Sequence, residues 1–105
     1  MVAIVVGGGD TAIDAARICK RLGANVTVLY RRTRAEMPAD AQEIDDALEE
    51  GVSLETLTLP VKVQKNRKGL KVTCQRMELG PADKSGRPRP VPIEGSEFDV
   101  HCDTI

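Results

Sequence analysis

The feature that most constrains this chain is a run of three glycines between an apolar segment and an amphipathic one. Residues 2–6, Val-Ala-Ile-Val-Val, are continuously apolar and mostly β-branched, which is typical of a parallel strand buried on both faces. Over residues 11–22 the apolar side chains recur at helical spacing, and Gly23 follows where a glycine often ends a helix. The sequence therefore predicts a strand, a tight turn at residues 7–9 and a helix.

The alternation of strand and helix continues to about residue 59. Residues 25–30 and 52–57 have strand composition, and residues 41–50 have helical periodicity. Asp40 and Glu43 have the spacing of a capping-box variant at the start of that helix. Strands separated by helices indicate a parallel sheet with right-handed crossovers, so residues 1–59 are predicted to form a βαβαβ half.

Residues 60–102 have no helical pattern. Residues 61–65, 70–79 and 98–102 alternate with a period of two, and prolines occupy positions 88, 90 and 92. A proline fits a strand where its missing N–H faces solvent, so residues 88–92 are predicted to be an edge strand. We expect a three-stranded antiparallel meander here, followed at residues 103–105 by the start of a closing strand beside residues 2–6.

Composition excludes several classes of function. The 15 basic residues nearly balance the 16 acidic ones, and aromatic residues make up 2%, so nothing favours nucleic acid or acidic membranes as partners. No apolar run approaches the roughly 20 residues of a membrane helix. The three cysteines form no C-x-x-C pair, which argues against a metal site or redox dithiol and indicates a reducing, cytoplasmic compartment. The single histidine, His101, is expected on a strand surface.

The glycine turn has the spacing of a dinucleotide-binding fingerprint, Gly7-x-Gly9-x-x-Ala12. The first glycine permits a tight turn, the second admits a pyrophosphate to the backbone, and the small third residue lets helix and strand pack closely. The start of the helix offers unpaired N–H groups and a partial positive charge. The alternative is a purely structural turn.

Basic residues follow the second predicted strand, where a dinucleotide-binding fold recognises the adenosine ribose. NAD-binding proteins place a carboxylate there, whereas this chain has Arg31, Arg32 and Arg34, with no carboxylate before Glu36. Arginines at this point suit the 2′-phosphate of NADP, which they can bind through charge-assisted hydrogen bonds. The alternative is a solvated basic loop.

Asp10 and Thr11 stand between the glycines and the helix. A carboxylate would repel a pyrophosphate, so Asp10 is predicted to cap the helix, with a contact to ribose or nicotinamide as the alternative. Thr11 is interpreted either as a donor to a phosphate oxygen or as an ordinary first-turn residue.

Four segments in order, residues 5–14, 30–39, 49–52 and 76–80, resemble the NADPH-binding domain of the glutamate synthase small subunit and related FAD oxidoreductases. Thioredoxin reductase is a more distant relative. The resemblance implies an α/β, Rossmann-like three-layer fold. In that family the domain is inserted into an FAD domain and NADPH passes hydride to the flavin. Electrons then continue through iron–sulfur clusters to a partner such as the glutamate synthase large subunit. The implied nucleotide contacts are Gly7, Gly8, Gly9, Asp10, Thr11, Ala12, Arg31, Arg32 and Arg34.

The chain also departs from that family. A second fingerprint for FAD and the cysteine clusters for iron–sulfur centres are absent. We therefore expect residues 1–105 to be one NADP(H)-binding domain of a larger flavoprotein, with no catalytic residue and no activity alone. A complete small dehydrogenase, a domain of a thioredoxin-reductase-type flavoprotein and a non-enzymatic interaction module remain alternatives. The open edge of the first strand also predicts self-association, for example as a homodimer.

Overall fold

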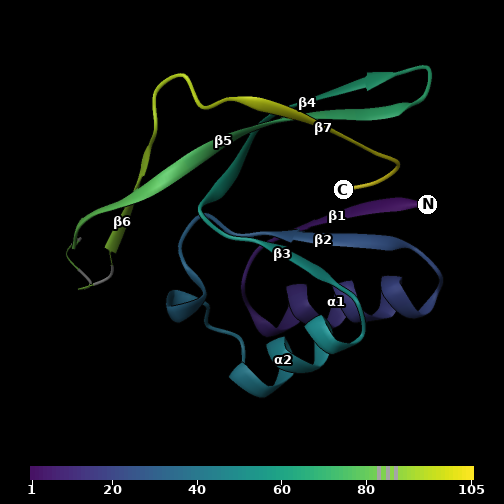
Figure 1. The fold of residues 1–105 in the computed structure, drawn as a ribbon, viewed down its shortest axis with the longest axis horizontal. Helices are drawn as coiled ribbons and strands as arrows, with labels where there is room; N and C mark the ends of the chain where they lie inside the picture. Colours follow the sequence, from purple (N-terminus) through teal and green to yellow (C-terminus); the bar gives the residue numbers. More distant parts are fainter. Residues whose placement is uncertain (83, 85, 87) are drawn as a thin grey trace.

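The computed structural model describes every residue except 83, 85 and 87, and it contains three stacked layers (Figure 1). Two helices cover one face of a parallel sheet, and an antiparallel sheet covers the other. The elements in chain order are β1 (Val2–Val6), α1 (Asp10–Arg21), β2 (Asn25–Leu29), η1 (Arg34–Glu36), α2 (Ala41–Glu49), β3 (Ser53–Glu55), β4 (Thr58–Asn66), β5 (Gly69–Ala82), β6 (Pro88–Pro92) and β7 (Phe98–Cys102). The predicted Rossmann-like α/β fold is confirmed.

The parallel sheet has the strand order β1-β2-β3, with Val2 opposite Asn25 at one end and Val6 opposite Leu29 at the other. The segment after β7 lies beside β1, where an isolated parallel bridge joins Ala3 and Thr104. The Ile4 N–H donates to the Thr104 carbonyl at 3.0 Å. The predicted position of residues 103–105 is therefore confirmed, while self-association stays a prediction.

The start of α1 differs from the sequence-based prediction. Gly9 is the N-cap residue, no side chain caps the helix, and Asp10 is already its first helical residue. The predicted capping role of Asp10 is therefore wrong, because its carboxylate accepts a hydrogen bond from the distant Asp40 N–H instead. At α2, Asp40 does cap the helix through the Gln42 N–H, but Glu43 bonds to Arg17 and does not complete a capping box.

In the described part of the chain the antiparallel layer has four strands, so the predicted three-stranded meander is wrong in strand number and order. The long strand β5 is central: β4 and β7 pair with its first half, and β6 pairs with its second half. In a meander β7 would lie beside β6. It returns to β5 because Phe98, Val100 and Cys102 can then pack against the parallel sheet. The edge-strand prediction for residues 88–92 and the lack of a helix between residues 60 and 102 hold for the described part of the chain.

Both faces of the parallel sheet are buried, as its apolar first strand predicted. Ala3 and Val28 pack with helix residues on one face, and Ile4 and Leu29 pack with Val72 and its neighbours on the other. Apolar burial on two faces fixes the sheet between its two covering layers. Within the described residues, no helix has the length and apolar character needed to cross a membrane.

Candidate functional site

A cavity of about 370 Å³ opens at the carboxyl ends of β1 and β2. Its lining comes from Val6 and Gly7, from residues 29–32 after and within β2, from Pro38 and from residues 58–60 at the start of β4. Ligands of open α/β sheets bind at this end of the strands. The cavity joins the glycine turn to the basic segment, which are the two regions that the sequence selected.

Each glycine of the turn has its own structural reason. Gly7 has a φ of +132°, and a Cβ there would lie 3.4 Å from the Ala12 Cβ, so the close approach of turn and helix is real. A Cβ on Gly8 would lie 2.7 Å from the Tyr30 ring, so this glycine is required by packing. The Cβ position of Gly9 is open, with Pro38 Cγ 4.0 Å away. Gly9 therefore leaves room for a group that approaches the backbone.

The N-terminal turn of α1 is free of side-chain caps among the described residues, since Gly9 has no side chain to provide one. The first intrahelical bond runs from the Ile13 N–H to the Gly9 carbonyl at 3.1 Å. The N–H groups before Ile13 precede that bond, and they carry the partial positive charge of the helix end. Asp10 and Thr11 are exposed and Ala12 is half-buried, all outside the cavity lining.

Arg31 and Arg32 both line the cavity but have different surroundings. Arg31 is exposed and forms no hydrogen bond or ion pair with the described residues. Arg32 is only 6% exposed, and its Nε donates to the Pro88 carbonyl of β6 at 2.9 Å. None of the described lining residues is acidic. Among the described residues, no carboxylate neutralises these two guanidinium charges at the cavity.

Arg34 is not brought to the same place. It lies in η1, outside the cavity lining, and its guanidinium forms an ion pair with Asp45 of α2. Of the predicted site residues, the structure thus places Gly7, Arg31 and Arg32 on the cavity wall. The remainder of the glycine turn adjoins that wall, and Arg34 faces α2.

Sequence reasoning missed two other lining residues, Pro38 and Thr58. The Thr58 hydroxyl donates to the Thr56 carbonyl at 2.9 Å and accepts from Arg76 Nη1 at 2.8 Å. Arg76 also bonds to Glu55 at 3.1 Å and lies over the Phe98 ring, 4.4 Å from its centroid. Pro38 could have been found from the Met-Pro-Ala sequence in the family-like segment 30–39. No local sequence pattern identifies Thr58 as a lining residue.

The cysteines and the histidine lie outside the described lining of the cavity. Burial raises the pKa of the Cys74 and Cys102 thiols, which therefore stay protonated and are poor nucleophiles at neutral pH. His101 is exposed on β7, as predicted. The described residues contain no group of three or more potential metal ligands. The arrangement is suited to binding an anionic ligand.

Comparisons with known proteins give consistent results. The chain is 54% identical to the NADPH-Fe(3+) oxidoreductase subunit beta of Geobacter sulfurreducens, over 97% of this chain and 16% of that protein. It is 43% identical to the glutamate synthase [NADPH] small chain of Azospirillum brasilense, over 97% of this chain and 21% of that protein. The chain thus spans about a fifth or less of the length of these relatives, and the predicted resemblance is confirmed.

Solved structures share the fold. Mycobacterium tuberculosis FprA in complex with NADPH superimposes with a TM-score of 0.81 and 14% identity, over 98% of this chain and 37% of that one. Lactococcus lactis thioredoxin reductase gives a TM-score of 0.64 and 22% identity, over 87% and 28% of the two chains. The sequence profile of the family described as "Pyridine nucleotide-disulphide oxidoreductase" matches residues 2–84. The chain therefore belongs to the pyridine nucleotide-disulphide oxidoreductase family.

Proposed function

We propose that this chain is an NADP(H)-binding domain that presents NADPH for hydride transfer to FAD in a longer flavoprotein. One observation carries the proposal: Arg31 and Arg32 line a cavity beside the glycine turn, and no acidic residue shares the described lining. Two guanidinium groups at the end of β2 that have no carboxylate partner among the described residues fit a ligand that bears a phosphate at the ribose 2′ position.

The glycine turn would receive the pyrophosphate. Gly9 leaves its Cβ position open, and no described side chain occupies the N-terminal end of α1. Backbone N–H groups and the helix dipole at that end favour a negatively charged group.

The two arginines would bind the 2′-phosphate in complementary ways. Arg32 donates from its Nε to the Pro88 carbonyl, which orients the guanidinium. No described residue accepts from its two terminal nitrogens, which would make a bidentate contact with the phosphate. Arg31 is exposed at the same wall and can turn toward the ligand. Arg34 would contribute less, since it is already paired with Asp45.

Calorimetric titration of the chain with NADPH and NADH tests the proposal. A charge-assisted hydrogen bond is worth roughly 1.5–3 kcal/mol before solvent screening, so we expect a preference for NADPH of about tenfold or more. Equal affinities would remove the 2′-phosphate assignment. Failure of both nucleotides to bind would instead favour the interaction-module alternative.

The hydride acceptor would lie outside residues 1–105. The chain carries one nucleotide fingerprint, and a cofactor such as FAD supplies the redox chemistry that protein side chains lack. FAD, iron–sulfur clusters and a partner such as a glutamate synthase large subunit would belong to the rest of such an assembly. We expect the 105-residue chain to purify without flavin absorbance and not to oxidise NADPH with an artificial acceptor. Flavin absorbance or NADPH oxidation by this chain would contradict the assignment of the hydride acceptor to the rest of the flavoprotein.

A further inference from the structure

We propose that Asp10 is a positioning residue, whose carboxylate holds residues 37–40 against the glycine turn and thereby places Pro38 at the cavity. The inference rests on the proposed nucleotide-binding function. It also accounts for a carboxylate beside a site that is suited to phosphates.

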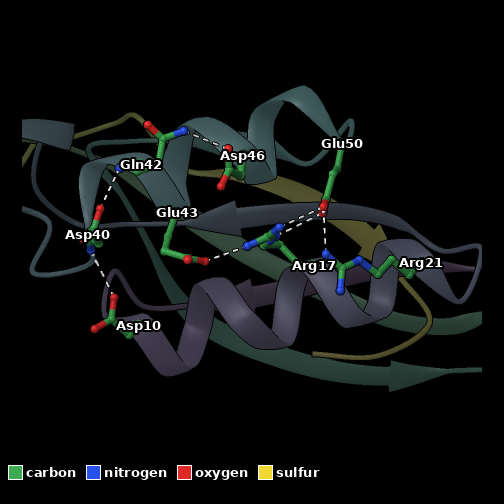
Figure 2. A network of polar contacts seen from close by, with 8 residues as sticks. All are labelled: Asp10, Arg17, Arg21, Asp40, Gln42, Glu43, Asp46 and Glu50. Atoms are coloured by element: carbon green, nitrogen blue, oxygen red, sulfur yellow. Dashed lines mark hydrogen bonds and ion pairs between the residues drawn. The ribbon is translucent and has the colours of Figure 1, made fainter.

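Two hydrogen bonds join the segment to the turn. The Ala39 N–H donates to the Gly8 carbonyl at 3.0 Å, and the Asp40 N–H donates to Asp10 Oδ1 at 3.1 Å. Asp40 is itself the N-cap of α2, with its carboxylate accepting from the Gln42 N–H at 2.8 Å. Figure 2 shows the Asp10–Asp40 and Asp40–Gln42 bonds, which run from the first turn of α1 to the first turn of α2.

The segment is also attached through the hydrophobic core, where Met37 and Ala39 are buried. Pro38 has no N–H, so Ala39 and Asp40 supply the backbone donors that face the turn. Met37 packs close to Gly8, whose Cβ position lies 3.1 Å from Met37 Cγ. Pro38 alone of residues 37–40 lines the cavity, and its Cγ lies 4.0 Å from the Cβ position of Gly9. Loss of the Asp10 bond would remove one of the two hydrogen bonds that hold the segment, and would leave Pro38 placed by the Ala39–Gly8 bond and the packing of Met37 and Ala39.

This role needs an acceptor oxygen at position 10 but not a negative charge. An asparagine can accept the same hydrogen bond from the Asp40 N–H, whereas an alanine cannot. A direct role in nucleotide binding predicts a different pattern, because a carboxylate that bound a ribose hydroxyl would be sensitive to both substitutions. The conservative variant therefore separates positioning from direct contact.

The test compares NADPH dissociation constants of Asp10→Asn and Asp10→Ala by calorimetry. Asp10→Asn should bind within about twofold of the native chain or more tightly, since it removes a charge near the phosphates. Asp10→Ala should bind about fivefold more weakly, the effect of one lost hydrogen bond. Gln42→Ala is the matched control. It removes the side-chain bond to Asp46 in α2, keeps the Asp10–Asp40 bond, and should leave the NADPH affinity within about twofold of the native value. Native affinity in Asp10→Ala, or equal weakening in Asp10→Asn, would overturn the inference.

Amide hydrogen exchange without nucleotide provides a second, independent measurement. The Asp40 amide should exchange faster in Asp10→Ala than in the native chain, and at a native rate in Asp10→Asn. An unchanged exchange rate of the Asp40 amide in Asp10→Ala would overturn the positioning role of Asp10, whether or not the native chain binds NADPH. Failure of the native chain to bind NADPH would refute only the proposed function. If Asp10→Ala does not fold, Pro38→Gly should weaken NADPH binding with Asp10 in place, and native affinity there would contradict the inference.

Discussion

Arginines occupy two regions of this molecule in opposite electrostatic states. Between the two helices, Arg17 of α1 bonds to Glu43 at 2.6 Å and to Glu50 at 3.0 Å, and Arg21 adds a bond to Glu50 at 2.9 Å (Figure 2). At the cavity, Arg32 Nε donates to the Pro88 backbone carbonyl, and Arg31 has no hydrogen-bond or ion-pair partner among the described residues.

The difference indicates two uses of the same side chain. Carboxylates from α2 and the residue after it neutralise Arg17, which joins the two helices over the sheet. The pairing raises the pKa of Arg17 and lowers the pKa of Glu50 to about 2. An arginine without a protein carboxylate retains its charge for an external anion. The first region should therefore control stability and the second should control nucleotide selectivity.

The largest expected effect is on selectivity at the cavity. Replacing both Arg31 and Arg32 by alanine should reduce the tenfold or greater preference for NADPH over NADH to about one. NADH affinity should stay nearly constant, because the loss falls on the 2′-phosphate. Calorimetry with both nucleotides measures the ratio. Arg67→Ala is the control, since it removes an exposed positive charge in the β4–β5 turn and should leave selectivity intact.

The ion pairs of Arg17 and Arg21 with Glu43 and Glu50, here called the helix network, should affect stability and not selectivity. Arg17→Met retains much of the aliphatic stem but removes the bonds to Glu43 and Glu50, so we expect the melting temperature to fall by roughly 5 °C. The ratio of NADPH to NADH affinity should not change. Arg21→Met, which removes a single more exposed bond, should have a smaller thermal effect. A loss of selectivity in Arg17→Met would break the proposed separation of the two regions.

Acid should weaken the helix network through Glu50. Hydrogen bonds from Arg17 and then Arg21 lower its folded-state pKa from 4.5 to about 2, so its stabilising contribution is complete above pH 4.5 and is lost as the pH falls toward 2. The melting temperature of Glu50→Gln should lie below that of the native chain at pH 7, and the gap should narrow between pH 4.5 and 2. If the difference in melting temperature between the two chains stays constant with pH, the charge of Glu50 is not the source of the stabilisation.

The smallest expected effect is that of salt on selectivity. Raising ionic strength from about 0.05 to 0.2 M screens the attraction between the two cavity arginines and the 2′-phosphate, so the NADPH preference should fall by roughly twofold. NADH binding should change less, because it lacks that phosphate. Titrations at both salt concentrations supply the comparison. An unchanged ratio would indicate that geometry and not charge selects the nucleotide.

The elements that were predicted correctly depend on local sequence. The apolar run at β1, the helical spacing in α1 and α2 and the alternating prolines of β6 each impose a backbone state within a few residues. The same holds for Gly7, whose φ of +132° and approach to Ala12 follow from the fingerprint itself. Local patterns therefore determined the layers and one wall of the site.

The errors all involve partners that are distant in sequence. Asp10 bonds to Asp40 rather than capping its own helix, and β7 returns to β5 because its apolar side chains need the parallel sheet. Arg32 is buried by its contact with Pro88, which a count of basic residues could not reveal. The composition of a segment specifies what a side chain can bond to, but the tertiary fold determines which partner is within reach.

The most direct test of the contrast between the two regions is an NMR titration that follows the arginine side-chain Nε–H signals as 2′,5′-ADP is added. This ligand carries the 2′-phosphate without the nicotinamide. The account predicts that the signals of Arg31 and Arg32 shift to saturation while those of Arg17 and Arg21 stay in place. Unchanged Arg31 and Arg32 signals at saturating ligand, or an equal shift of Arg17, would contradict it.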